Sequence, residues 1–473
     1  MLAVAPSALW SGDAESFLQP ALQILSGEKS ILSKRGIAYV LLLIPFVAYP
    51  QHFFLALALF QQTLMSAVIL GAAVFARLLL GRASLPLIMI IGIGTGFYDV
   101  PIFVAHLIRN EVLQGFCLMM GVGFLGLALK EKTFFATTMS GFFFALTNLV
   151  KATQPLLIVL AAMLLWWRYR QEQTGWKVAT VVVASYCAVH FGCMLASVTT
   201  GLKFKTVPYA GCELYSQVAH IGWVDSHKYP QLSAFIREAV EKYISLKKRD
   251  NGYVRHNIIS LIEEYKESKG TKYPPVDEIC RTLAFEILFT YPFRCAVDFG
   301  HKAVILHTRT GFKSKRPRLS HIQEAGAKAK EAYEELMIQQ GFVKKFPINF
   351  EPAIALQNTK ESTAYYFLKS LTLLALPYSW ISIVTVNSML SLVLLAFTRG
   401  WLRLWCLQLA FAWFFFILLH VTVAEPKDRF LVPMVSISFW LCTIGTYMAV
   451  KLLGKLATVI SFLVFKTNSP NLE

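Results

Sequence analysis

Long apolar runs, separated by short basic or polar stretches, dominate the pattern of this chain. They recur over residues 36–199 and again from residue 379 onward, and a polar stretch at 200–365 lies between the two groups. A helix needs about 20 mainly apolar residues to cross a bilayer. The pattern therefore predicts an all-α polytopic membrane protein with about 10–11 spans.

The apolar runs also set the expected boundaries of the spans. The run 36–50 is about fifteen residues long and contains Pro45, so we expect an interfacial helix there and not a crossing. If this run did cross, every later loop would change sides. Residues 1–10 are apolar but only about half as long as a spanning helix, so we interpret them as a shortened first helix. The last run, 456–466, is too short to assign. The remaining runs predict spans at 52–80, 84–98, 111–129, 133–150, 154–167, 177–199, 379–397, 404–424 and 430–450.

The polar stretch divides the chain into three expected parts. Residues 1–199 form an N-terminal transmembrane module whose first outer loop is 11–50, and residues 366–473 form a C-terminal set of helices. Residues 200–365 carry 25 of the 45 Lys and Arg and 18 of the 28 Asp and Glu. Helical spacing of Phe235, Val240, Tyr243 and Ile244 predicts a mostly helical extramembrane region on the outer side.

Composition and charge narrow the class further. Of the 473 residues 56% are hydrophobic and the mean hydropathy is +0.53, which excludes an ordinary soluble protein of this size. The net charge of +17 comes from Lys and Arg beside apolar runs, where they orient helices and meet anionic lipid, so we expect membrane lipids and no nucleic acid as partners. Eight cysteines lack metal-ligand spacing; a disulfide among Cys212, Cys280 and Cys295 stays open.

Basic residues assign the two sides of the membrane. Arg77, Arg82, Lys130, Lys132, Arg168, Arg170 and Lys177 fall on alternate loops, which the positive-inside rule makes cytoplasmic. Ten acids lie outside 200–365, and this topology places six of them at outer membrane edges: Asp13, Glu15, Asp99, Glu111, Glu425 and Asp428. The clustering predicts a shared outer-face site. The alternative is that short outer loops simply need polar residues.

Cations accompany these acids on the same side. They are Lys34, Arg35, Arg109, Lys151 and Arg429. A single cation of this kind is more often a snorkelling anchor. Together, however, an acid that takes a proton from a hydroxyl and cations that hold a phosphate leaving group suit displacement at a phosphorylated donor.

Seven short segments, in this order, carry a resemblance to a known family. They are Gly12–Glu15, Ala21–Leu25, Arg35–Tyr39, Asn110–Glu111, Leu149–Pro155, Ala284–Pro292 and Glu425–Pro433. In this order the chain resembles the GT-C class of membrane glycosyltransferases, such as protein O-mannosyltransferases, lipid A aminoarabinose transferases and catalytic oligosaccharyltransferase subunits. The chain departs from the family in lacking a Pro before Gly36 and in the two added residues Lys427 and Asp428.

The resemblance implies a GT-C-like bundle and an inverting transfer of a sugar from a polyprenyl-phosphate donor to a glycan, lipid or protein hydroxyl. It implies a bacterial inner membrane with the site on the periplasmic face and Asp13 as general base. Glu15 and Glu111 would orient the acceptor or hold a divalent cation, although some branches suggest catalysis without one. Tyr39 and Glu425 are further expected substrate contacts, and the expected phosphate partners are Lys34, Arg35, Lys151 and Arg429.

Two other classes stay open. A secondary transporter or lipid flippase would use the same acids as proton or ion sites, but transporters tend to show paired repeats, and no second half repeats the first here. A structural or assembly subunit would give the outer acids no purpose. Release of polyprenyl phosphate distinguishes a transferase from a transporter.

Overall fold

The structure is a computed structural model of the chain, and every regular element it describes is a helix. The expected all-α fold is therefore confirmed over these residues. The described residues are 14–27, 37–49, 52–81, 85–86, 88–89, 105, 108–151, 156–199, 210–222, 224–247, 252–269, 273–309, 335, 338, 383–422 and 432–468.

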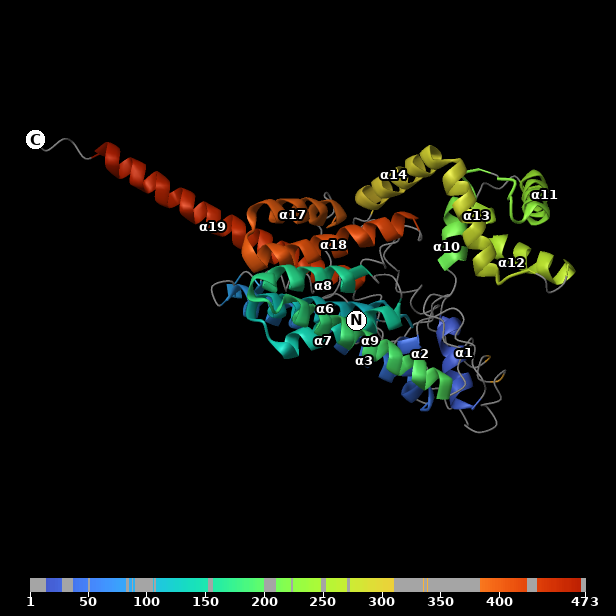
Figure 1. The fold of residues 1–473 in the computed structure, drawn as a ribbon, viewed down its shortest axis with the longest axis horizontal. Helices are drawn as coiled ribbons and strands as arrows, with labels where there is room; N and C mark the ends of the chain where they lie inside the picture. Colours follow the sequence, from blue (N-terminus) through green and yellow to red (C-terminus); the bar gives the residue numbers. More distant parts are fainter. Residues whose placement is uncertain are drawn as a thin grey trace, which may run out of the picture.

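Eight of the described helices form an elongated bundle (Figure 1). Their limits lie within a few residues of the expected spans, with two exceptions: α19 is longer than its expected span, and the span 84–98 falls almost wholly outside the described residues. They are α3 (Phe53–Leu80), α6 (Glu111–Glu131), α7 (Phe134–Val150), α8 (Leu156–Tyr169), α9 (Gly175–Thr199), α17 (Ile383–Phe397), α18 (Gly400–Thr422) and α19 (Val435–Asn468).

Five segments of the described chain are long and apolar enough to cross a membrane. They are Phe53–Leu80, Glu111–Glu131, Gly175–Leu195, Gly400–Leu419 and Val432–Ser461. The apolar helices α7 and α17 are shorter, with 17 and 15 residues. The chain is thus a polytopic membrane protein by helix length and composition, and the larger number of 10–11 spans stays a prediction.

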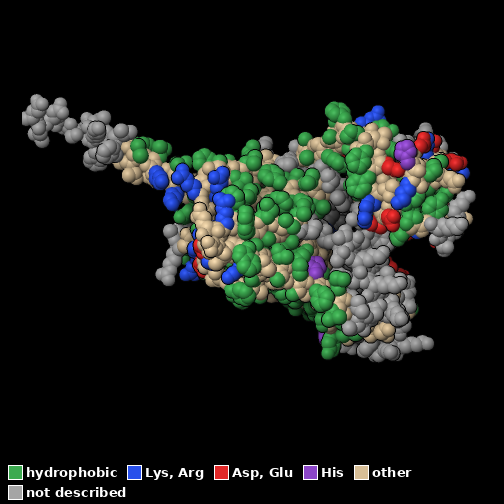
Figure 2. Space-filling model, viewed as in Figure 1, with side chains coloured by type: hydrophobic (Ala, Val, Ile, Leu, Met, Phe, Trp, Pro, Cys, Tyr) green, Lys and Arg blue, Asp and Glu red, His purple; other side chains and the backbone are tan. Residues whose placement is uncertain are grey.

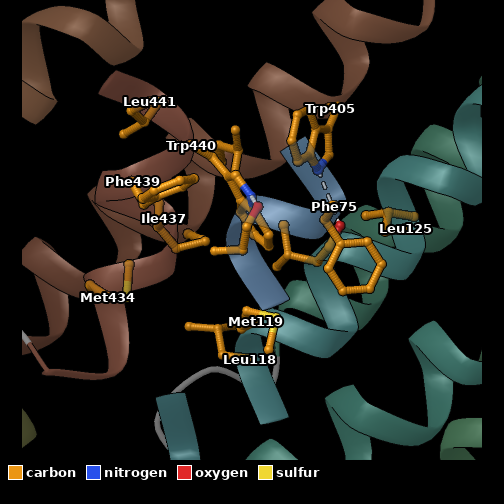
Figure 3. Close-up of a cluster of buried hydrophobic side chains, with 14 of the residues drawn as sticks. Phe75, Leu118, Met119, Leu125, Trp405, Met434, Ile437, Phe439, Trp440 and Leu441 are labelled. Carbon is orange, nitrogen blue, oxygen red and sulfur yellow. Dashed lines mark hydrogen bonds between the residues drawn. The ribbon is translucent and has the colours of Figure 1, made fainter. Parts of the chain in front are cut away.

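Large aromatic side chains join the N-terminal and C-terminal helices of the bundle (Figure 3). The indole nitrogen of Trp440 in α19 donates to the Ala72 carbonyl of α3 at 2.9 Å. That of Trp405 in α18 donates to the Val122 carbonyl of α6 at 3.1 Å. Because a buried indole N–H needs an acceptor, these bonds fix α18 and α19 against α3 and α6.

The C-terminal helix is longer than the sequence pattern predicted. We expected a span that closes near residue 450, but α19 continues as one helix to Asn468 and extends beyond the bundle (Figure 1). The only helix-disfavouring residue near the expected end is Gly454, and one glycine costs about 1 kcal/mol, which does not end a helix. The run 456–466 is therefore the end of α19 and not a separate element.

The segment that we expect to be the first outer loop supplies two short helices, α1 (Ala14–Leu25) and α2 (Ile37–Val47). With 11 residues α2 extends about 16 Å. It is not among the described helices that could cross a membrane. The Phe17 ring of α1 meets the Tyr39 ring of α2 edge-on at 4.9 Å. This pair packs in one apolar cluster with Phe53 of α3 and Leu149 of α7, so α1 and α2 lie against one end of the bundle.

Five helices between α9 and α17 form a second apolar core of their own. Over the described residues the region is helical, as predicted. Three of its cysteines, Cys212, Cys280 and Cys295, are buried in or beside this core and are free thiols. The helices are α10 (Ala210–Val218), α11 (Pro230–Lys247), α12 (Gly252–Lys269), α13 (Val276–Thr290) and α14 (Pro292–Arg309).

Basic side chains gather at one end of the bundle, at the left in Figure 2. There the Lys130 ammonium donates to the Leu78 carbonyl at 2.6 Å, and Lys132 pairs with Glu172. The Tyr169 hydroxyl donates to the Ala128 carbonyl at 2.6 Å, which joins α8 to α6. We call this the basic end; α1 and α2 lie at the opposite end (Figure 1).

Candidate functional site

A buried group of polar side chains lies at the end of the bundle opposite the basic end. We call it the polar junction; it consists of Tyr39, Gln61, Arg109, Asn110 and Glu111, each between 1% and 7% exposed. These residues come from α2, from α3 and from the segment that opens α6. A lone polar group is costly to bury in an apolar bundle, so such a group calls for partners.

Gln61 holds the junction together. Its amide nitrogen donates to the Tyr39 hydroxyl at 2.9 Å and to the Arg109 carbonyl at 3.0 Å. The amide nitrogen of Asn110 donates to the Val150 carbonyl at the end of α7, also at 3.0 Å. Four segments of the chain therefore meet at one place.

The charged pair of the junction is loose. The Arg109 Nη1 atom lies 3.8 Å from Glu111 Oε1, whereas a charge-assisted hydrogen bond of this kind is about 2.7–2.9 Å long. Glu111 is the first residue of α6, where the helix dipole favours a negative charge. The carboxylate is thus held by a helix end and by a nearby cation, but not by a short bond to that cation.

Two buried oxygens of the junction keep their capacity to accept hydrogen bonds. They are Gln61 Oε1 and Glu111 Oε2, and neither has a hydrogen-bond partner among the described residues. A buried acceptor without a donor costs about 1–3 kcal/mol. Two of them in one group give the junction the means to bind a hydroxyl, an ammonium or a metal cation.

The structure brings together two of the expected site residues, Tyr39 and Glu111. Lys151 is close by, because it ends α7 directly after Val150, whose carbonyl binds Asn110. Glu15 is exposed in the first turn of α1. The others, Asp13, Lys34, Arg35, Glu425 and Arg429, lie outside the described residues.

Residues next to two of those expected site residues do lie near the junction. Ala14 follows Asp13 and belongs to the apolar cluster that contains Tyr39. Val432 lies three residues after Arg429, and its carbonyl oxygen would be 3.3 Å from a Cβ atom placed on Gly115, one turn after Glu111. Gly115 therefore permits the segment before α19 to approach the start of α6.

Sequence reasoning missed Gln61. Its only signal is a polar pair, Gln61 and Gln62, inside an apolar run. It also missed a second polar group between α7 and α9. There the Asn148 amide nitrogen donates to the Tyr186 hydroxyl at 2.5 Å, and the Tyr186 ring lies 4.6 Å from that of His190.

A third polar group lies in the helical region between α9 and α17. Asp298 of α14 forms an ion pair with the Lys302 ammonium at 2.6 Å and lies 3.1 Å from His220 Nε2. Burial by itself would raise the pKa of Asp298, but the bonds from His220 and Lys302 and the charge of Lys302 outweigh it and hold this pKa at about 2. Because it joins α14 to the end of α10, we assign this group a structural role.

Among the residues that the structure describes, no three His, Cys, Asp or Glu side chains lie together in a way that could hold a metal ion. Comparison with known proteins adds no relative: no family model, no curated protein and no solved structure matches the chain. The candidate function therefore rests on the polar junction and on the sequence segments that meet there.

Proposed function

We propose that this chain is an inverting membrane glycosyltransferase of the GT-C class, which moves a sugar from a polyprenyl phosphate to an acceptor hydroxyl. The observation that carries the proposal is the meeting of Tyr39 and Glu111 in one buried polar junction. These residues belong to two of the seven segments in which the chain resembles that class, and they are 72 residues apart.

The proposed reaction is a single displacement. Asp13 takes the proton of the acceptor hydroxyl, and the hydroxyl oxygen forms a bond to C1 of the sugar. The bond from C1 to the phosphate oxygen breaks on the opposite face, and polyprenyl phosphate leaves with its negative charge. Lys34, Arg35, Lys151 and Arg429 would hold this phosphate; Arg429 suits it best because guanidinium binds phosphate with two parallel bonds.

The junction would serve the acceptor side of this reaction. Glu111 Oε2 and Gln61 Oε1 are buried acceptors, so they can bind sugar or acceptor hydroxyls that point toward α6. A divalent cation near Glu111 is the alternative use of the same oxygens. Glu15 and Glu425 are further proposed substrate contacts. Glu15 is exposed on α1, and Glu425 lies outside the described residues.

The proposed side of the membrane follows from the basic end. Basic residues favour the cytoplasmic side, so the polar junction faces outward, which in a bacterial inner membrane is the periplasm. An impermeant thiol reagent tests this assignment on intact cells. A cysteine that replaces exposed Glu15 should react, and one that replaces Lys132 should react only after the cells are opened; the reverse result would contradict the topology.

Sugar transfer tests the activity. Membranes that carry Asp13→Asn are compared with the wild-type chain at equal protein level, with a set of polyprenyl-phosphate hexoses and pentoses as donors. Loss of a general base lowers the rate about 10²- to 10⁴-fold. The control is Asp225→Asn, because Asp225 is exposed and pairs with Arg237 far from the junction. Full transfer by Asp13→Asn would remove Asp13 as the base.

Release of polyprenyl phosphate separates the two main classes. A transferase produces it from the donor in proportion to the sugar transferred, whereas a transporter or flippase moves its cargo and releases none. If no donor of the set yields polyprenyl phosphate while labelled lipid or solute crosses the membrane, the transporter alternative replaces our proposal.

A further inference from the structure

An apolar stripe runs along the exposed side of α13 and α14. Phe289 and Phe293 are 81% and 79% exposed, and Phe285 and Val297 continue the stripe at the same spacing of four residues. The Phe285 and Phe289 rings stack at 6.2 Å. A soluble surface rarely keeps so large an apolar patch without a partner.

The stripe has members on both sides of the bend between the two helices. The Tyr291 nitrogen donates to the Ile287 carbonyl at 2.9 Å, and the Cys295 nitrogen donates to the Tyr291 carbonyl at 3.0 Å. Tyr291 itself is not helical (φ −124°, ψ 50°), so α13 ends there and α14 begins directly after it. Phe285 and Phe289 form the part of the stripe on α13, and Phe293 and Val297 form the part on α14.

The position of α14 places this surface beside the membrane-spanning bundle. Phe299 and Ala303 of α14 pack against the core of the bundle. The helix contacts α17 and α18 and meets the bundle at the end opposite the basic end (Figure 1). On α17, Met389 and Leu392 are 64% and 61% exposed, as expected of a surface that faces lipid.

The stripe differs from the rest of the outer helical region in having few charged side chains. The exposed residues of α11 and α12 include Glu238, Glu241, Glu263 and Glu264, which suit water. On α14 the exposed residues include the apolar row Phe293, Val297, Gly300 and Val304, with Arg294 and His301 beside it. An apolar face flanked by a cation is typical of a helix that lies in the boundary between lipid headgroups and acyl chains.

We infer that α13 and α14 form a membrane anchor whose phenylalanine stripe enters the outer leaflet next to α17. The occupant of the stripe is lipid, because the stripe is uncharged, continues the apolar side of the bundle and comes from a helix that is packed on the bundle. Such an anchor would hold the outer helical region close to the membrane surface, whatever reaction the chain performs.

Spin-label accessibility tests the anchor in the full chain, reconstituted in vesicles of phosphatidylcholine and phosphatidylglycerol. The exposed and half-exposed thiols of α9 are first removed by Cys187→Ala and Cys193→Ala. A nitroxide is then attached to Phe293→Cys or Phe289→Cys. Collision rates with oxygen, which concentrates in lipid, and with a water-soluble nickel chelate are measured.

Two matched positions calibrate the result. Leu392→Cys on α17 gives the lipid value, and Ala234→Cys on the exposed side of α11 gives the water value. We expect the stripe positions to show an oxygen-to-nickel ratio several-fold above that of Ala234→Cys and near that of Leu392→Cys.

Two results would overturn the inference. One is a ratio at the stripe equal to that of Ala234→Cys, which means water. The other is low collision with both reagents, which means contact with protein, such as a second copy of the chain. If a phenylalanine variant fails to fold, Val297→Cys on the same stripe is a smaller change and decides between the same outcomes.

Discussion

The two ends of the helix bundle both carry ion pairs, but the pairs differ in how much water they meet. At the basic end the side chains of Lys132 and Glu172 are 36% and 48% exposed, whereas those of Arg109 and Glu111 in the polar junction are 9% and 4% exposed. An exposed pair contributes about 0–1 kcal/mol to stability. A buried pair must first offset a desolvation cost of several kcal/mol per ion.

This difference separates two uses of charge. The exposed pair at the basic end lies where lysines and arginines orient the helices, and water can replace either partner. At the junction an apolar pair of similar volume would often be as stable as the buried charges. The burial of Arg109 and Glu111 therefore points to a use other than stability, and we propose that this use is the binding of substrate.

Removing one partner at each end should give the largest contrast. Arg109→Met removes the cation that pairs with Glu111 and leaves this carboxylate buried. The free energy of unfolding should therefore fall by about 3–5 kcal/mol. Lys132→Met at the basic end should cost less than about 1 kcal/mol. Thermal unfolding of both variants in nanodiscs measures the difference; equal losses would mean that the junction pair is as solvated as the exposed one.

Gln61 sharpens the comparison because it joins the junction without carrying charge. Gln61→Leu removes the donor to both Tyr39 and the Arg109 carbonyl, so we expect a loss of about 2–3 kcal/mol and a marked fall in sugar transfer. Thr63→Val on the same helix removes one exposed bond to Leu59 and serves as the control. A Gln61→Leu chain with the stability and transfer of its control would show that the junction does not depend on this amide.

The Asp298 group extends the comparison to the helical region between α9 and α17 and to pH. The pKa of Asp298 is about 2 in the fold against 3.8 for a free side chain, so its stabilisation is complete above about pH 4 and is lost as the pH falls toward 2. We expect Asp298→Asn to lower local stability at pH 7 by about 2 kcal/mol. Hydrogen exchange measures the local stability of α10 and α14 in the wild-type chain and in Asp298→Asn at several pH values. The difference between the two chains should shrink below pH 4, and a difference that persists at pH 2 would contradict this prediction.

The smallest expected effect concerns the approach of α19 to the junction. A Cβ atom on Gly115 would lie 3.2 Å from the Pro433 Cα atom, whereas one on Gly192 would meet nothing within 4 Å. Both alanine variants gain about 1 kcal/mol of helix propensity. Gly192→Ala should therefore raise the unfolding temperature, and Gly115→Ala should not. An equal rise in both variants would show that the segment around Pro433 has room for a methyl group on residue 115.

The sequence predicted the helices well because the bilayer imposes a simple pattern. A span must be apolar and long enough to cross, so the limits of α3, α6 and α9 follow from the hydropathy of each segment alone. The pattern failed at the C-terminus. There the run after Lys455 is too short to be a span by itself, and only the structure shows that it continues α19 to Asn468.

The site was less predictable than the helices. Tyr39 and Glu111 could be chosen from the sequence for two reasons. Each lies in a segment that resembles the GT-C class, and the pattern of basic loops predicts the same side of the membrane for both. Gln61 could not, because a polar residue in an apolar helix can face a neighbouring helix, a cavity or another polar group, and the hydropathy pattern is the same for all three.

The amino-acid sequence by itself determined that the chain is helical and apolar, since both properties depend on neighbouring residues and on the bilayer as solvent. Its orientation in the membrane stays a prediction from the basic loops. Only the tertiary structure decided which helix ends meet. Gln61 reaches Tyr39 and the Arg109 carbonyl through packing between α2, α3 and α6. Val432 reaches Gly115 because Trp440 and Trp405 fix the last helices against the first. Such contacts depend on the shapes of side chains far apart in sequence, and no local pattern records them.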